Sequence, residues 1–128
     1  MDKNLKEKTK EFLSSCDGMH ENMKMLHWST TNKAEHLLSD EIDGDVLGYQ
    51  DKIAEAAMGC LGTRFGFGDL KAMVSDANNM EGLLKDFKAD VLAYKAAVGD
   101  EPSRSGIQNI IDDILTDINK WNYLRTLK

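Results

Sequence analysis

The chain has 128 residues, of which 41% are hydrophobic and 30% charged, with a single proline and a formal net charge of -6. These values are typical of one globular domain spanning residues 1–128, and they exclude a disordered chain. The acidic balance argues against DNA binding, and no apolar run approaches the roughly 20 residues that span a bilayer. Without an apolar signal core, the chain is expected to be cytoplasmic, with Cys16 and Cys60 as reduced thiols.

Helical periodicity predicts a first helix over about residues 5–28, followed by a short polar turn. Asn32 is the expected cap of a second helix that runs to about residue 58. Gly59 can then adopt the left-handed conformation that ends a helix. The glycine-rich residues 59–68 are predicted to form a loop, with one helical turn around residues 70–73.

Two further helices are predicted over about residues 79–98 and 105–127, and no segment has the strict alternation of a strand. Four amphipathic helices of about twenty residues predict an all-α, four-helix bundle. The longest connection joins the second helix to the third, as expected if it travels the length of the bundle. This pattern does not specify a function.

The second helix carries potential metal ligands on one stripe. At 100° per residue four of them share this stripe: His36, Asp40, Asp51 and Glu55. Gly44 and Gly48 lie on the same stripe, although a glycine inside a helix costs about 1 kcal/mol relative to alanine. Close approach of another backbone is the usual reason for such glycines.

The two pairs of ligands are too far apart to serve one metal ion within a single chain. Asp40 and Asp51 are eleven residues apart, or roughly 16 Å along the helix axis. If two copies of the helix cross antiparallel near its middle, His36 faces Glu55 of the second copy and Asp40 faces Asp51. A two-fold dimer would then contain two identical sites.

The first helix contributes one more ligand to each site. His27 and His36 are equally far from the centre of the polar turn, so they are expected at the same level. Each site would combine His27, His36 and Asp40 of one copy with Asp51 and Glu55 of the other. Two imidazoles with three carboxylates suit iron or manganese, and zinc also fits.

A simpler interpretation of each ligand pair is a solvated helix face, where Asp and Glu are common. The joint occurrence of the stripe, the mirror spacing and the central glycines favours a metal site. His20 is interpreted as a boundary residue, and Asp43 lies on the stripe without an assigned role.

These residues resemble the mini-ferritins of the DNA-protection-during-starvation (Dps) family. The resemblance rests on Leu26-His27-Trp28, on the His-x-x-x-Asp pair from residue 36 and on the Asp-x-x-x-Glu pair from residue 51. It is strong over residues 20–58, and the family's short helix between the second and third helices is not evident.

The resemblance implies a ferritin-like bundle that oxidises Fe(II) with hydrogen peroxide or dioxygen. It implies that the catalytic iron ligands, shared between two subunits, are His27, His36, Asp40, Asp51 and Glu55. A full shell would store the oxidised iron, whereas a dimer would only detoxify or bind it. The alternative is a non-catalytic helical homodimer whose acidic stripe is a partner-binding surface or a vestige. A metal-dependent enzyme of another kind is a third hypothesis.

Overall fold

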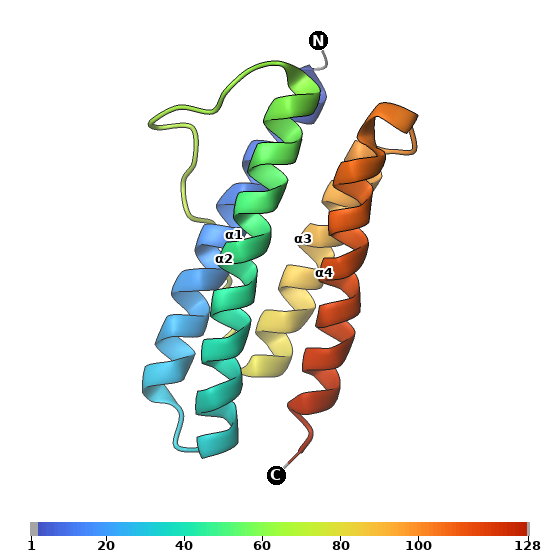
Figure 1. Cartoon of the computed structure of the whole chain (residues 1–128). Coiled ribbons are helices and arrows are strands. Elements are labelled where there is room, and N and C mark those ends of the chain that lie inside the picture. Colours follow the sequence, from blue (N-terminus) through green and yellow to red (C-terminus); the bar gives the residue numbers. More distant parts are fainter. Residues whose placement is uncertain (1–2, 128) are drawn as a thin grey trace.

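The computed structural model describes residues 3–127, and within this range it is all-α, as predicted (Figure 1). Its long helices and one short 3-10 helix, η1, have the following bounds: α1 Lys3–Ser29, α2 Lys33–Leu61, α3 Met80–Val98, η1 Pro102–Arg104 and α4 Ser105–Leu124. None of these helices is long and apolar enough to cross a membrane.

The helices form two antiparallel hairpins joined by one long connection (Figure 1). α1 and α2 make the first hairpin, and α3 and α4 make the second. Residues 62–79 run back along the bundle between them, so α2 and α3 point in the same direction. The main contacts are α1 with α2 and α3, and α4 with α2 and α3. The expected length-spanning connection is therefore confirmed.

The core between the four helices is apolar and contains several large aromatic side chains. Phe12 stacks on Tyr94 with 4.8 Å between ring centroids, and Trp121 is fully buried. The Tyr94 hydroxyl lies 2.8 Å from the Thr9 hydroxyl, so its polar end is hydrogen-bonded. Both cysteines are free thiols, and burial raises the pKa of Cys16.

The start of α2 follows the predicted capping chemistry, and the start of α3 uses the same chemistry. The Asn32 side chain accepts a hydrogen bond from the backbone N–H of Glu35 at the start of α2. Asn79 does the same for Gly82 at the start of α3. Each asparagine satisfies a backbone donor that the first helical turn leaves without a partner.

The predicted end of α2 is wrong by one helical turn. Gly59 lies inside the helix, and Gly62 adopts the left-handed conformation with φ of 70°. Its N–H donates to the carbonyl of Met58 at 2.9 Å. α4 ends at Leu124, about three residues before the predicted end at residue 127.

Residues 70–77, which we call the strap, lie against α1 without the predicted helical turn. The N–H of Met73 donates to the carbonyl of Ser14 at 3.0 Å, and the N–H of Lys71 donates to the Ser14 hydroxyl at 3.2 Å. Gly18 permits this approach, because a Cβ there would lie 1.9 Å from the Met73 carbonyl oxygen. The backbone N–H groups of the strap thus donate hydrogen bonds to α1 in place of the hydrogen bonds that a helical turn would make.

Candidate metal site on α1 and α2

His27 and His36 form a reciprocal pair where α1 meets α2. Their rings stack with centroids 3.7 Å apart and planes inclined by 19°. Nδ1 of His27 donates to the carbonyl of His36 at 2.7 Å, and Nδ1 of His36 donates to the carbonyl of His27 at 2.8 Å. The two histidines lie at the same level, as their equal distance from the turn predicts.

This bonding fixes the tautomer of both imidazoles. A carbonyl only accepts, so each Nδ1 carries the hydrogen and Nε2 of the neutral ring keeps its lone pair. Metal-binding histidines commonly donate their second ring nitrogen to a backbone carbonyl in this way. His36 is exposed and His27 is half-buried, so the pair lies at the surface.

Ser39 supports the pair and was not anticipated from the sequence. Its hydroxyl donates to the His36 carbonyl at 2.9 Å and lies 3.4 Å from Nδ1 of His27. Ser39 is buried beneath the histidines. A small polar residue three positions after a histidine in a helix is too common a pattern to identify such a contact.

Asp51 and Glu55 form the second pair, one helical turn apart near the carboxyl end of α2. Both are exposed. A hydrogen bond with Asp51, followed by the charge of Asp51, raises the pKa of Glu55. The two carboxyl groups therefore lie close together, and a bound cation would offset the repulsion between their charges.

The predicted ligands do not all come together in one copy of the chain. Within residues 3–127, no group of three or more His, Cys, Asp or Glu side chains could hold a metal ion. The histidine pair lies near the start of α2, the carboxyl pair lies towards its end, and Asp40 is exposed one turn after His36. One copy thus presents two separate half-sites.

Apart from His27, which belongs to α1, both half-sites lie on the side of α2 opposite the core. We call this side the outward face of α2, and it comprises residues 36, 37, 40, 44, 47, 48, 51 and 55, all exposed. A Cβ added at Gly44 or Gly48 would meet no atom within 4 Å. Leu37 and Leu47 are 59% and 37% exposed on the same face. Packing within the chain therefore does not require these glycines.

The third histidine of the chain, His20, pairs with an acid of α2 farther from the turn of the same hairpin. Nδ1 of His20 lies 2.5 Å from a carboxylate oxygen of Asp43, and both side chains are partly buried. The boundary position predicted for His20 agrees with this contact, which also gives Asp43 a partner. His20 and Asp43 are equidistant from the turn, so the rule that paired His27 with His36 would have found them.

Trp28 directly follows His27 in the sequence, and its indole lies outside the core. It is 65% exposed, and the ammonium group of Lys24 lies 5.5 Å from the centroid of its ring. Packing within one copy of the chain therefore does not explain why a tryptophan occupies this exposed position.

Comparison with known proteins gives a family but no activity. No curated protein and no solved structure matches the chain significantly. A family model matches residues 27–124, a range that contains all five predicted ligands. The chain therefore belongs to the DUF5856 family, a family of unknown function.

Proposed function

We propose that this protein binds Fe(II) between two copies of the chain and oxidises it with hydrogen peroxide or dioxygen, as Dps mini-ferritins do. The observation that carries the proposal is the reciprocal bonding of His27 and His36. It holds two imidazoles with Nε2 as the acceptor nitrogen, the form that binds metal. Iron is the substrate, and manganese or zinc would compete for the same ligands.

The path of the chain supports a ferritin-like bundle. Two antiparallel hairpins joined by a single long crossover are the arrangement of ferritin-like folds (Figure 1). Residues 62–79 make that crossover here. The iron site, however, would lie on the outward face of α2, because the bundle core between the helices is apolar.

Antiparallel pairing of α2 with a second copy would complete the site. It would bring His27, His36 and Asp40 of one copy opposite Asp51 and Glu55 of the other. Gly44 and Gly48 would lie at the crossing, where the two backbones come closest. Each glycine costs about 1 kcal/mol in an isolated helix, and a contact between copies would offset that cost.

The ligand set suits a pair of iron ions. Nearly parallel imidazoles 3.7 Å apart cannot aim both lone pairs at one ion, but their separation matches the roughly 3.5–4 Å between ions in two-metal sites. Asp40, Asp51 and Glu55 would bridge the ions and compensate their charge. Anionic oxygen ligands stabilise Fe(III) more than Fe(II), which favours oxidation.

The proposed oxidation needs only Fe(II), the oxidant and, for dioxygen, protons from water. Each Fe(II) ion gives up one electron, so a pair of ions supplies the two electrons that cleave the O–O bond of hydrogen peroxide. The products are two Fe(III) ions and two hydroxide ions. With dioxygen as the oxidant, the same pair of electrons and two protons first give hydrogen peroxide.

Loss of the carboxyl pair tests the proposal. Fe(II) is added without oxygen, hydrogen peroxide follows, and Fe(III) absorbance is recorded. We expect the Asp51→Ala, Glu55→Ala double variant to react at least about tenfold more slowly than the wild type. The matched control is Glu7→Ala with Glu11→Ala, which removes two exposed acids at the same spacing on α1. Equal rates in all three proteins would refute iron oxidation at this site.

A non-catalytic homodimer is the second candidate. Leu37 and Leu47 expose apolar surface beside Gly44 and Gly48, and such a surface can pair without any metal. Both candidates predict a dimer by light scattering, so Fe(II) binding and oxidation separate the two functions. A dimer that neither binds nor oxidises Fe(II) would favour the second candidate.

A further inference from the structure

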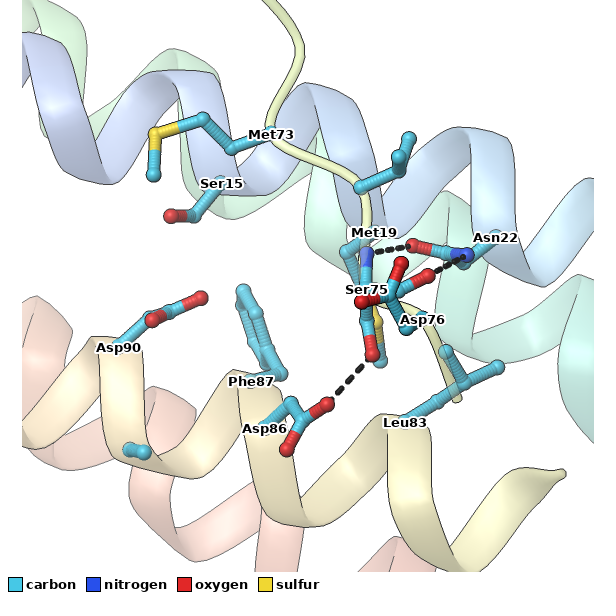
Figure 2. Close-up of a pocket in the computed structure, with 12 residues that line it drawn as sticks. Ser15, Met19, Asn22, Met73, Ser75, Asp76, Leu83, Asp86, Phe87 and Asp90 are labelled. Carbon is cyan, nitrogen blue, oxygen red and sulfur yellow. Dashed lines mark hydrogen bonds between the residues drawn. The ribbon is translucent and has the colours of Figure 1, made fainter. Parts of the chain in front are cut away.

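A cavity of about 360 Å³ lies between α1, α3 and the strap (Figure 2). Its floor consists of side chains that are almost fully buried: Met19, Leu83 and Phe87. Met73 and Val74 of the strap form one wall. Sites for small molecules have volumes of roughly 300–1,000 Å³ and a mainly apolar lining with few polar groups.

The charged groups of this cavity are all negative. Carboxylates come from Asp76 of the strap and from Asp86 and Asp90 of α3, and the described residues that line the cavity include no Lys, Arg or His. Asp90 is exposed, but partial burial of its carboxyl group raises its pKa, against a hydrogen bond from Ser15 that lowers it. Ser15 and Asp90 point into the space between α1 and α3 (Figure 2). The cavity therefore favours a cation.

The wall opposite α3 is held in place before any ligand binds. The Ser75 hydroxyl donates to Asp86 at 2.5 Å, and Asn22 of α1 bonds the N–H and the carbonyl of Ser75 at 2.8 and 3.1 Å (Figure 2). Binding would not have to order this segment, and a preformed site loses less entropy on binding.

The shape of the cavity fits an elongated cation better than a metal ion. Its three carboxylates do not meet around one point, and no group of three or more possible metal ligands occurs within residues 3–127. A smaller cavity of about 120 Å³ continues between the same two helices and shares Ser15, Met73 and Asp90. Its lining also includes Lys8, whose charge is paired with Glu11 at 3.3 Å. Asp86 and Asp90 are one turn apart, a rise of about 6 Å along α3.

We propose that this cavity binds a linear aliphatic polyamine. The methylene groups would lie on Met19 and Phe87, and successive ammonium groups would pair with Asp86 and Asp90. Three or four methylenes separate two ammonium groups by about 5–6 Å, close to the rise of one helical turn. The net charge of -6 also attracts cations to the whole molecule. This binding is independent of the proposed iron chemistry.

Calorimetric titration with spermidine, putrescine and butylamine at constant ionic strength tests the proposal. We expect spermidine and putrescine to bind and butylamine, which has one ammonium group, to bind at least about fivefold more weakly. Asp90→Asn should weaken spermidine binding by about fivefold or more. The matched control Asp100→Asn removes the same charge from an exposed position outside the cavity and should leave the affinity unchanged.

A second variant separates cavity shape from charge. Ala89 lines the cavity and is exposed, so Ala89→Leu should narrow the space without disturbing the core or any carboxylate. We expect it to weaken spermidine binding while the melting temperature stays that of the wild type. No binding of spermidine, or equal weakening by Asp90→Asn and Asp100→Asn, would overturn the proposal.

Discussion

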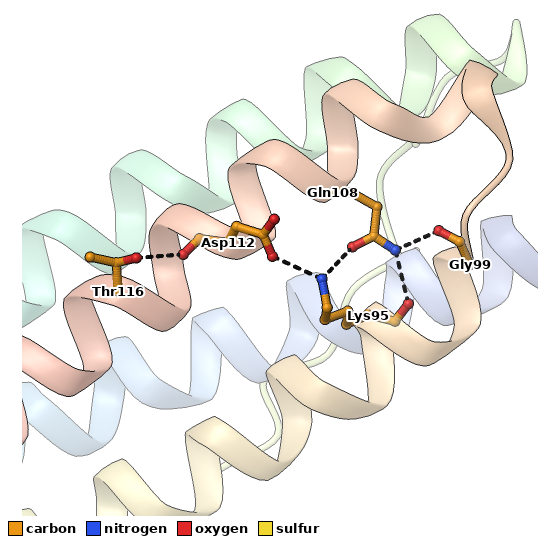
Figure 3. A network of polar contacts seen from close by, with 5 residues as sticks. All are labelled: Lys95, Gly99, Gln108, Asp112 and Thr116. Carbon is orange, nitrogen blue, oxygen red and sulfur yellow. Dashed lines mark hydrogen bonds and ion pairs between the residues drawn. The ribbon is translucent and has the colours of Figure 1, made fainter.

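The two hairpins of the bundle use polar side chains in different ways. In the α3–α4 hairpin, the Lys95 ammonium group donates to Gln108 at 3.1 Å and to Asp112 at 2.8 Å (Figure 3). The Gln108 amide in turn donates to the carbonyls of Lys95 and Gly99. Donors and acceptors of this network satisfy one another, and its physical role is to join two helices.

In the α1–α2 hairpin, the Gln50 amide also joins the helices by donating to the Leu13 carbonyl at 2.9 Å and to Asp17 at 2.6 Å. The histidines of this hairpin, in contrast, each use one ring nitrogen only. His27 and His36 use Nδ1 for each other's carbonyl, and His20 uses Nδ1 for Asp43. These contacts leave the Nε2 atoms for another partner. Contacts that join two helices can therefore use all the polar atoms of a side chain, as Gln108 does, or leave a ring nitrogen for another partner, as the histidines do.

Replacing the histidine pair should have the largest effect. In the His27→Gln, His36→Gln variant the imidazole ligands are lost, so we expect Fe(II) oxidation to fall by about 100-fold. The matched change in the other hairpin, Lys95→Ala with Gln108→Ala, should lower stability and leave oxidation per folded molecule unchanged. Stopped-flow absorbance and thermal unfolding measure both quantities. A similar loss of oxidation in both variants would contradict the difference between the hairpins.

A charge at the centre of the outward face of α2 should separate the two copies. Gly44→Glu leaves the fold intact, because a Cβ at this position meets no atom within 4 Å. We expect light scattering to show a monomer, and Fe(II) oxidation to fall with dimer content. Gly106→Glu is the matched control in α4, where a Cβ also meets no atom. A Gly44→Glu variant with the mass of the wild type would contradict pairing across this face.

A methyl group at Gly18 should displace the strap. The added Cβ would lie 1.9 Å from the Met73 carbonyl oxygen, which belongs to the backbone and cannot rotate away. We expect Gly18→Ala to lower the free energy of unfolding by about 1–3 kcal/mol, the usual range for overpacking. Chemical denaturation measures this change. Gly59→Ala, inside α2 with open space around it, should not destabilise the protein.

The smallest expected effect concerns the contact between the two hairpins. Burial, followed by the charges of Asp117 and Glu41, raises the pKa of Asp45 on α2. The folded state therefore holds this proton more tightly than the unfolded state, and the corresponding stability is lost as pH rises through the raised pKa. We expect Asp45→Asn to raise the melting temperature at neutral pH. The gain in melting temperature should vanish below about pH 3, where the carboxyl group is protonated in both the folded and the unfolded state. An equal gain at neutral pH and at about pH 3 would show that the raised pKa of Asp45 is not the cause.

Local chemistry explains which features could be predicted from the sequence. Asn32 and Asn79 act through backbone groups three residues away, so the helix starts were predictable. The pairing of His27 with His36 follows from symmetry about one short turn. The strap was not predictable, because its conformation depends on Ser14 and on Asn22, which lies 53 positions before Ser75. The end of α2 was missed because Gly59 and Gly62 are equally good caps in sequence.

Pairing of α2 with a second copy of itself is the central claim, and cysteine cross-linking tests it most directly. In a Cys60→Ser background, chains with Asp40→Cys are mixed with chains carrying Asp51→Cys and treated with a short bifunctional maleimide. The antiparallel crossing predicts covalent dimers that contain one chain of each kind. Like chains should not cross-link, because their cysteines would lie roughly 16 Å apart. Absence of the mixed product, or equal linking of like and unlike chains, would contradict the account.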